Sequence, residues 1–408
     1  SARIGRAAKK VSAKRVAIAL PKEVIDTLDT QKTAEGVVCG MRLGTYTFNK
    51  HKSEESQKKE KEIEEVLMLV LAPKLDETAK GIDRGVIVSD AVMFARDLVN
   101  ESPSVTTPKY LGEVARRLAK PANKIIAEVL GVKEIESLGM GALLAIARGS
   151  SQEPRFIHLT YTGGGNKTVV LIGKGVTFDT GGLSLKPSDH METMKLDMAG
   201  AAAVLGVFSV LSVLKLKINV VGLIPATENM PGPNAIKPGD VVKAMNGKTI
   251  EILNTDAEGR VVLADALSYA TAKIKSDVIV DIATLTGACA AALGEEISGL
   301  FSNNRNLADL LKKAGDDSGE KLWELPLAKA YMEQLKSTVA DIRNISKTRY
   351  GGAINGALFL SEFVPKNTPW AHVDIAGPAF AEKDAPLTPH GGTGYGVRLL
   401  IQYLSSFS

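Results

Sequence analysis

The stretch "EILNTDAEGRVVLADALSYATAK", residues 251–273, contains the step from strand to helix on which the fold depends. Its first residues fit a short apolar strand, and from Val261 onward apolar residues recur at helical spacing. Asp256, Glu258 and Arg260 stand between the two. A helix start explains the acids by itself, because the backbone dipole is positive in the first turn of a helix. The alternative is that they form a site at the end of the strand.

The same alternation of strand and helix extends through most of the chain. Strand-like runs lie at 155–161, 168–173, 218–226, 249–253, 277–285 and 370–377, and helical runs lie at 198–214 and 260–273. Buried strands separated by helices predict an α/β fold with a mixed, largely parallel sheet flanked by helices. The pieces "TGGGN" (162–166) and "MNGKT" (245–249) are typical of hairpin turns.

The first 82 residues have a different pattern. Two short runs, 14–21 and 65–73, predict buried strands, and a helical pattern covers about 22–36. The charged residues 50–65 alternate in sign, which favours a solvated loop over a binding patch. We therefore predict two domains, a smaller α/β domain at 1–82 and a larger domain at 83–408.

Composition narrows the class of protein. Of the 408 residues, 45% are hydrophobic and 24% are charged, as in ordinary globular proteins. The net charge of +4 is too small to indicate nucleic acid as a partner. Two cysteines, Cys39 and Cys289, exclude a disulfide framework. No signal peptide and no membrane-spanning apolar run stand out, so we expect a cytoplasmic protein without a membrane partner.

Acidic and basic residues collect where the predicted strands end. Lys174 and Asp179 follow the strand at 168–173, Lys186 and Asp197 come next, and Asp256, Glu258 and Arg260 follow the strand at 249–253. If the chain stays extended after residue 253, Asp256 and Glu258 point to the same side.

Ligands of open α/β sheets bind beyond the carboxyl ends of the strands, so these side chains are expected to meet. Four carboxylates in one pocket repel one another unless cations compensate them, and two divalent ions would do so. Oxygen-rich ligation suits Mn²⁺ or Mg²⁺, and Zn²⁺ also accepts carboxylates. A two-metal phosphoesterase would use the same chemistry and remains an alternative.

Several blocks of the sequence resemble the leucyl aminopeptidase family, also called cytosol aminopeptidases. The family signature "NTDAEGR" is present at 254–260. Further similar blocks, in the family's order, are "GKGVTFDTGG", "LDMAGAAAV", "ATENMPGPNAIKPGDVV", "DIATLTGAC" and "WAHVDIAG". The resemblance covers roughly residues 83–403 and makes the helix-start explanation of Asp256 and Glu258 secondary.

The resemblance implies a peptidase with two divalent ions per subunit, Mn²⁺ or Zn²⁺ with Mg²⁺ as an alternative, which activate a water molecule. One ion would be held by Lys174, Asp179, Asp197 and Glu258, and the other by Asp179, Asp256 and Glu258. Lys186 would polarise the scissile carbonyl. Arg260 would hold a bicarbonate ion that acts as general base.

The same resemblance implies substrates that are peptides with a free amino terminus and a Leu-like first residue. The pocket for that residue would be lined by Met194, Thr284, Gly287 and Ala376. It also implies a homohexamer. The region before residue 83 is shorter than the family's usual amino-terminal domain. Some family members bind DNA, but the low net charge does not favour nucleic acid here.

Overall fold

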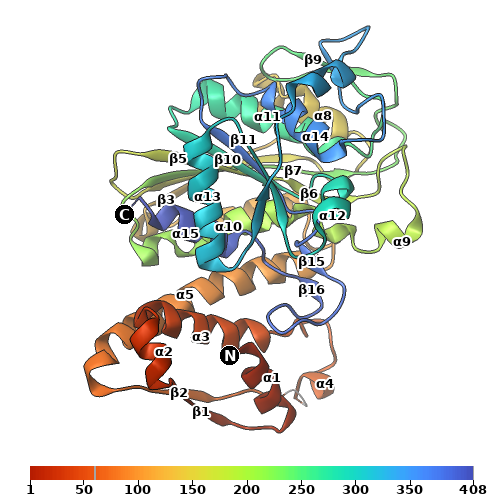
Figure 1. The fold of residues 1–408 in the computed structure, drawn as a ribbon. Coiled ribbons are helices and arrows are strands. Elements are labelled where there is room, and N and C mark those ends of the chain that lie inside the picture. The colour runs from red at the N-terminus through yellow and green to blue at the C-terminus, as the bar shows by residue number, and fades with distance from the viewer. Residues whose placement is uncertain (59–60, 408) are drawn as a thin grey trace.

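The computed structural model describes residues 1–58 and 61–407, which form a small amino-terminal part below a larger α/β part (Figure 1). In the described residues, nine strands make the central sheet of the larger part, in the order β12-β11-β14-β10-β5-β7-β4-β3 with β6 paired to β7. The strands are β3 (Ile125–Leu130), β4 (Arg155–Thr162), β5 (Thr168–Gly173), β6 (Gly175–Asp179), β7 (Asn219–Asn229), β10 (Val278–Ala283), β11 (Ser298–Ser302), β12 (Leu322–Glu324) and β14 (Trp370–Asp374).

The centre of this sheet is parallel and its flanks are antiparallel. β14, β10, β5 and β7 run parallel to one another, whereas β11 against β14, β4 against β7 and β3 against β4 are antiparallel. Their carboxyl ends therefore meet at one edge, where ligands of such sheets bind. The predicted α/β class with a mixed, largely parallel sheet is confirmed.

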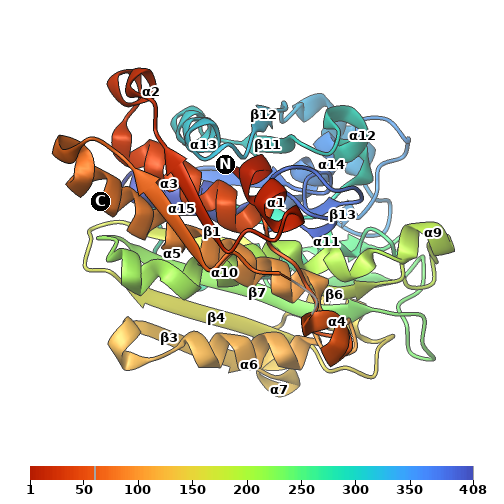
Figure 2. The same cartoon turned by 90° about the horizontal axis from the view of Figure 1, so that it is seen from below.

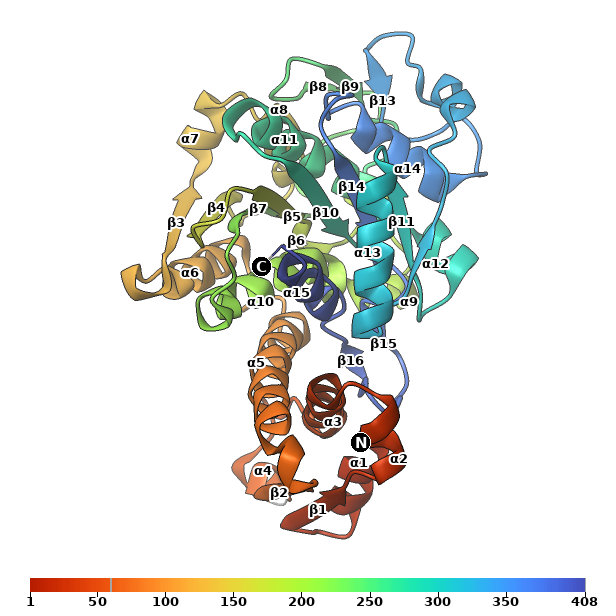
Figure 3. The same ribbon diagram turned by 60° about the vertical axis from the view of Figure 1, so that its left-hand side comes forward.

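Alternating side chains of the strands enter two hydrophobic cores, because successive residues of a strand point to opposite faces. In β5, Val169 and Leu171 face one core, and Val170 and Ile172 face the other. Helices cover both faces, so the strands are apolar on both sides (Figure 3).

The first face is covered by α5 (Leu75–Asn100), α6 (Pro108–Leu118), α10 (Ala199–Leu214), α13 (Arg305–Ser318) and α15 (Val397–Ser405). The second is covered by α7 (Val132–Ser137), α8 (Gly141–Ala147), α11 (Glu258–Lys273) and α14 (Gly352–Ser361).

Shorter elements lie around this sandwich. Two small sheets contain β8 (Val241–Lys243), β9 (Thr249–Glu251), β13 (Ile342–Arg343), β15 (Phe380–Ala381) and β16 (Gly391–Gly392). The short helices are η2 (Pro121–Asn123), α9 (Ser188–Met191), η3 (Met194–Met198), α12 (Gly287–Leu293) and η4 (Lys329–Leu335).

The amino-terminal part contains helices and a parallel two-stranded sheet (Figure 2). Its elements are α1 (Ala2–Lys10), β1 (Arg15–Ala19), α2 (Lys22–Thr27), α3 (Thr30–Gly44), α4 (Glu54–Lys58), β2 (Glu65–Leu69) and η1 (Ala72–Lys74). α3 packs against α5, which leads into the larger part (Figures 1 and 3).

Four expectations about the secondary structure differ from the structure in whole or in part. β1 and β2 are mostly exposed rather than buried, because a sheet of two strands has no layer covering both faces. The helical pattern at 22–36 is two helices with a break at Leu28. The charged stretch 50–65 is solvated as predicted but is not entirely a loop, because it contains α4, in which no residue is buried; residues 59–60 lie outside the described residues.

The fourth concerns the turns. "TGGGN" joins β4 and β5, which are not paired because β7 lies between them, whereas "MNGKT" does join the antiparallel pair β8 and β9. The boundary placed after residue 82 lies inside the continuous helix α5, and the division into two domains stays a prediction.

One described segment, Ser188–Leu214, is long and apolar enough to cross a membrane by length and composition alone. Its apolar window is 83% buried within the fold, as in a central core helix. Cys39 and Cys289 are both buried and free.

Candidate active site

The carboxyl edge of the parallel strands carries a dense cluster of charged side chains. β6 ends on Asp179, opposite Asn229 at the end of β7. Lys174 connects β5 to β6, Asp197 lies in η3, and Glu258 is the first residue of α11. The topology thus brings together residues from four separate segments of the chain.

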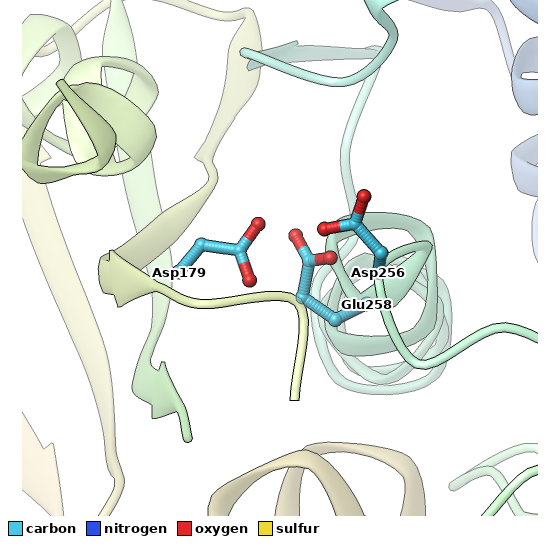
Figure 4. Close-up of side chains that lie close together, drawn as sticks. All are labelled: Asp179, Asp256 and Glu258. Atoms are coloured by element: carbon cyan, nitrogen blue, oxygen red, sulfur yellow. The ribbon is translucent and has the colours of Figure 1, made fainter. Parts of the chain in front are cut away.

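Three carboxylates lie side by side in this cluster. Asp179, Asp256 and Glu258 each offer an oxygen within 4.8 Å of the others (Figure 4). Asp179 and Glu258 are buried, and Asp256 is half-buried. Removing three acids from water at this spacing is unfavourable unless cations lie among them.

Lys174 links a fourth buried carboxylate, Asp197, to this group. Its Nζ donates to Asp197 Oδ1 at 2.6 Å and lies 2.9 Å from Glu258 Oε1. Nζ also donates to the backbone oxygen of Thr284 at 2.9 Å. The residues expected to hold metal therefore form one continuous set.

Lys186 lies on the other side of the acids. Its Nζ is 2.9 Å from Asp179 Oδ2 and also contacts Asp256 Oδ1. The four carboxylates and the two lysines together carry a net charge of −2 if all are ionised. The cluster therefore retains an affinity for further positive charge.

The pKa shifts reflect this excess of acid. Burial lowers the pKa of Lys174, but the charges of Asp197, Glu258 and Asp179 outweigh burial and raise it. A simple ion pair would lower the pKa of its acid, yet the pKa of Asp197 is raised, by burial first and by its acidic neighbours. The pKa of Asp179 is raised for the same reasons. The raised pKa of Lys174 and the raised pKa of Asp197 are consistent with each other, because one lysine forms ion pairs with several carboxylates.

Unpartnered oxygen atoms allow the cluster to be tested as a metal site. Among the described residues, Asp197 Oδ2 and Glu258 Oε2 are buried and have no hydrogen-bond partner. Buried polar atoms nearly always have one, so two such oxygens beside a close group of acids fit divalent ions. Carboxylate oxygens are the ligands that Mn²⁺ and Mg²⁺ prefer, and Zn²⁺ accepts them.

The chain between Asp256 and Glu258 does not stay extended, contrary to the assumption made from the sequence. β9 ends at Glu251, and Asn254 then folds a turn in which its Oδ1 accepts from Asp256 N at 2.8 Å. Glu258 does begin α11, and its Oε1 lies 2.9 Å from Lys174 Nζ, so the side chain belongs to the charged cluster as well. Both carboxylates reach the cluster through the turn.

Arg260 is a buried cation for which the described residues provide no ion pair, although the charges of Glu258 and Asp374 act on it from a greater distance. Its Nη1 donates to Asn344 O at 3.0 Å, and burial lowers its pKa. Its Nε finds no hydrogen-bond partner in the part of the chain that the structure describes. An unpaired buried guanidinium is unfavourable, which makes this a place for a small anion.

The four predicted pocket residues lie directly after β10 and β14, in η3 and in α12. Thr284 follows β10, Gly287 begins α12, Ala376 follows β14 and Met194 begins η3. β10 and β14 are parallel neighbours, which places Thr284 near Ala376.

Thr284 has more than a lining role. Its Oγ1 donates to Asp197 Oδ1 at 2.7 Å, on the same oxygen that accepts from Lys174. Its side chain therefore orients the acid.

The sequence analysis missed two asparagines that hold the cluster. Asn229 Nδ2 donates to Asp179 Oδ1 at 2.7 Å and to Thr255 O at 2.9 Å, so it ties two ligand-bearing segments together. Asn229 stands just after the end of a predicted strand and in a block that resembles the family, and these two features could have identified it as a site residue. Asn344 supports Arg260 and the backbone at 253–254 from another segment, and no sequence pattern marks it.

Most of this chain is similar to known proteins. The family model described as "Cytosol aminopeptidase family, catalytic domain" matches residues 93–401. The chain is 45% identical over 404 residues to "Probable cytosol aminopeptidase" of Geobacter sp. (strain M21), covering 98% of this chain and 79% of that protein. It is 47% identical over 412 residues to the protein of the same name from Thermosynechococcus vestitus, covering 100% and 81%.

The fold is similar to that of a solved structure, "Bottromycin maturation enzyme BotP in complex with Mn". The TM-score is 0.90 at 38% identity, over 99% of this chain and 86% of that chain. The chain belongs to the cytosol aminopeptidase family.

Proposed function

We propose that this metal-dependent aminopeptidase holds two divalent ions per subunit and removes the first residue of a peptide, preferring Leu-like residues. The observation that carries the proposal is the group of four carboxylates that, among the described residues, form ion pairs with two lysines and leave oxygens of Asp197 and Glu258 without a partner. The relatives named as cytosol aminopeptidases support the reaction class.

The residues that would hold the ions are those of the cluster. One ion would be bound by Lys174, Asp179, Asp197 and Glu258, and the other by Asp179, Asp256 and Glu258. Mn²⁺ or Zn²⁺ suits these donors, with Mg²⁺ as an alternative. When bound, such ions polarise a carbonyl and lower the pKa of water. Lys174 must lose its proton to be a ligand, and the charge of a dication favours this loss.

Two further cations would act on the substrate. The ammonium group of Lys186 contacts the carboxylates of Asp179 and Asp256. It is proposed to stabilise negative charge on the carbonyl oxygen of the scissile bond. Arg260 is proposed to hold bicarbonate, which would take the proton from the attacking water. Its support is the buried guanidinium with a free Nε.

The proposed specificity follows from the four pocket residues. Met194, Gly287 and Ala376 offer apolar or small surface, and Thr284 Oγ1 is already engaged with Asp197. Such a lining favours an aliphatic side chain over a charged one. The free amino group of the substrate is proposed to bind one of the metal ions, which would restrict cleavage to the first residue.

The proposal includes a homohexamer in the cytoplasm, with no membrane and no nucleic acid as partner. The hexamer is proposed from the family resemblance. The cytoplasmic location is supported by the word "cytosol" in the names of the relatives.

The deciding experiment uses metal-stripped protein and a panel of amino-acid anilides, with each divalent ion restored in turn. We expect no turnover without metal, recovery with Mn²⁺ or Zn²⁺, and the highest rate with leucine anilide. A phosphate monoester in the same assay tests the phosphoesterase alternative. Full activity without metal, or hydrolysis of the ester but not of anilides, would overturn the proposal.

A further inference from the structure

Lys195 lies between two residues that the proposed function uses, the pocket residue Met194 and the metal ligand Asp197. It is half-buried in η3, and its Nζ donates to the backbone oxygen of Asn100 at 2.8 Å. Asn100 is the last residue of α5, so this hydrogen bond joins segments 95 positions apart.

The end of α5 is a site that a cation stabilises. The last turn of this 26-residue helix contains no basic residue of its own. The carbonyl groups of a helix carboxyl end carry partial negative charge and need donors from elsewhere. Lys195 supplies both a donor and a positive charge to that end.

Asn100 is itself held in place by its side chain. Its Oδ1 accepts from Gly392 N at 2.8 Å, and its Nδ2 donates to Tyr46 Oη at 3.2 Å. Tyr46 in turn donates to Asp97 Oδ1 at 2.7 Å. The acceptor for Lys195 is therefore a fixed point where the amino-terminal part, α5 and β16 meet.

We propose that Lys195 is a positioning residue that fixes η3 against the end of α5 and so sets both metal binding by Asp197 and the place of Met194. The proposal rests on the proposed function. Lys174 and Thr284 both donate hydrogen bonds to Oδ1 of Asp197. These two bonds hold the carboxylate of Asp197 but do not connect η3 to α5. Among the described residues the Lys195 bond is the hydrogen bond that joins η3 to α5, so without it the backbone that carries Asp197 and Met194 is held less firmly.

The test compares Lys195→Met, which keeps the length and loses the charge, with Lys195→Arg, which keeps a charged donor. Lys9→Met is the matched control. Lys9 donates to Thr45 O at 3.1 Å, at the carboxyl cap of α3, so the same kind of bond is removed far from the cluster.

Two measurements on metal-stripped protein separate the inference from the proposed function. Hydrogen exchange, followed by mass spectrometry without any metal, should be about tenfold faster at η3 in Lys195→Met and unchanged in Lys9→Met. Titration calorimetry with Mn²⁺ alone should show affinity about 10- to 100-fold weaker in Lys195→Met, as for groups that orient a ligand. Lys195→Arg should recover most of both differences.

Unchanged exchange at η3 in Lys195→Met would overturn the inference, as would an equal loss in Lys195→Arg. If the wild type takes up no Mn²⁺, the proposed metal site fails, and the exchange measurement still decides whether Lys195 positions η3.

Discussion

Lys186→Ala separates binding from chemistry in the proposed reaction. In the structure Lys186 Nζ lies 2.9 Å from Asp179 Oδ2, with side chains 15% and 3% exposed. Removing one partner of a buried pair destabilises a protein by about 3–5 kcal/mol, and the partial exposure of Lys186 favours the lower value. The metal-free variant should therefore be less stable by about 3 kcal/mol.

Divalent ions should reverse this loss of stability. They supply the positive charge that Asp179 and Asp256 lose with Lys186, so Mn²⁺ affinity should not fall. Turnover should fall instead, because a cation aimed at the developing oxyanion acts on the transition state. Losing one such donor costs about 100- to 1,000-fold in kcat, or about 2.7–4 kcal/mol, with little change in KM.

The assays are leucine anilide hydrolysis at saturating Mn²⁺, Mn²⁺ calorimetry, and urea unfolding with and without metal. The control is Lys237→Ala, an exposed lysine whose Nζ lies 3.5 Å from Asp240 and which should change stability by less than about 0.5 kcal/mol. Lys186→Arg should restore stability more than turnover, since its planar fork does not reproduce a compact ammonium. A wild-type kcat in Lys186→Ala would refute the role of Lys186, and a large loss of Mn²⁺ affinity would make it part of the metal site.

Three further predictions follow from the same structure. A strong chelator should abolish activity and Mn²⁺ or Zn²⁺ should restore it, and elemental analysis that finds active protein without metal would contradict this. Glu258→Ala should lower metal content and turnover together while circular dichroism stays native, because Glu258 Oε2 is one of the unpartnered oxygens; a full complement of metal would leave Glu258 as a helix-start residue. Burial raises the pKa of Asp265 to about 7, against hydrogen bonds from Leu143 N and Met245 N. Its folded pKa exceeds its unfolded value of about 4, so its contribution to stability is present below pH 4 and is lost as the pH rises to about 7. Urea unfolding from pH 4 to 8 should show wild type losing a few kcal/mol relative to Asp265→Asn, and parallel pH profiles would contradict the shift.

The sequence by itself determined the elements and the class of fold. β5 (Thr168–Gly173) coincides with its predicted range, and α10 and α11 begin within two residues of theirs. Apolar runs with strand or helix periodicity depend on local side-chain patterns, which is why they can be identified without a structure. The order of Lys174, Asp179, Asp197, Asp256 and Glu258 after predicted strand ends also pointed to one shared edge of the sheet.

Only the tertiary structure decided which segments are neighbours. β7 lies between β4 and β5, which no local pattern predicts, because strand pairing depends on contacts between distant residues. The exposure of β1 and β2 has the same origin, since an apolar strand is buried only where another layer covers it. Asn229, Asn344 and Lys195 form hydrogen bonds with residues 50, 84 and 95 positions away along the chain. Contacts between residues so far apart cannot be identified from local sequence patterns.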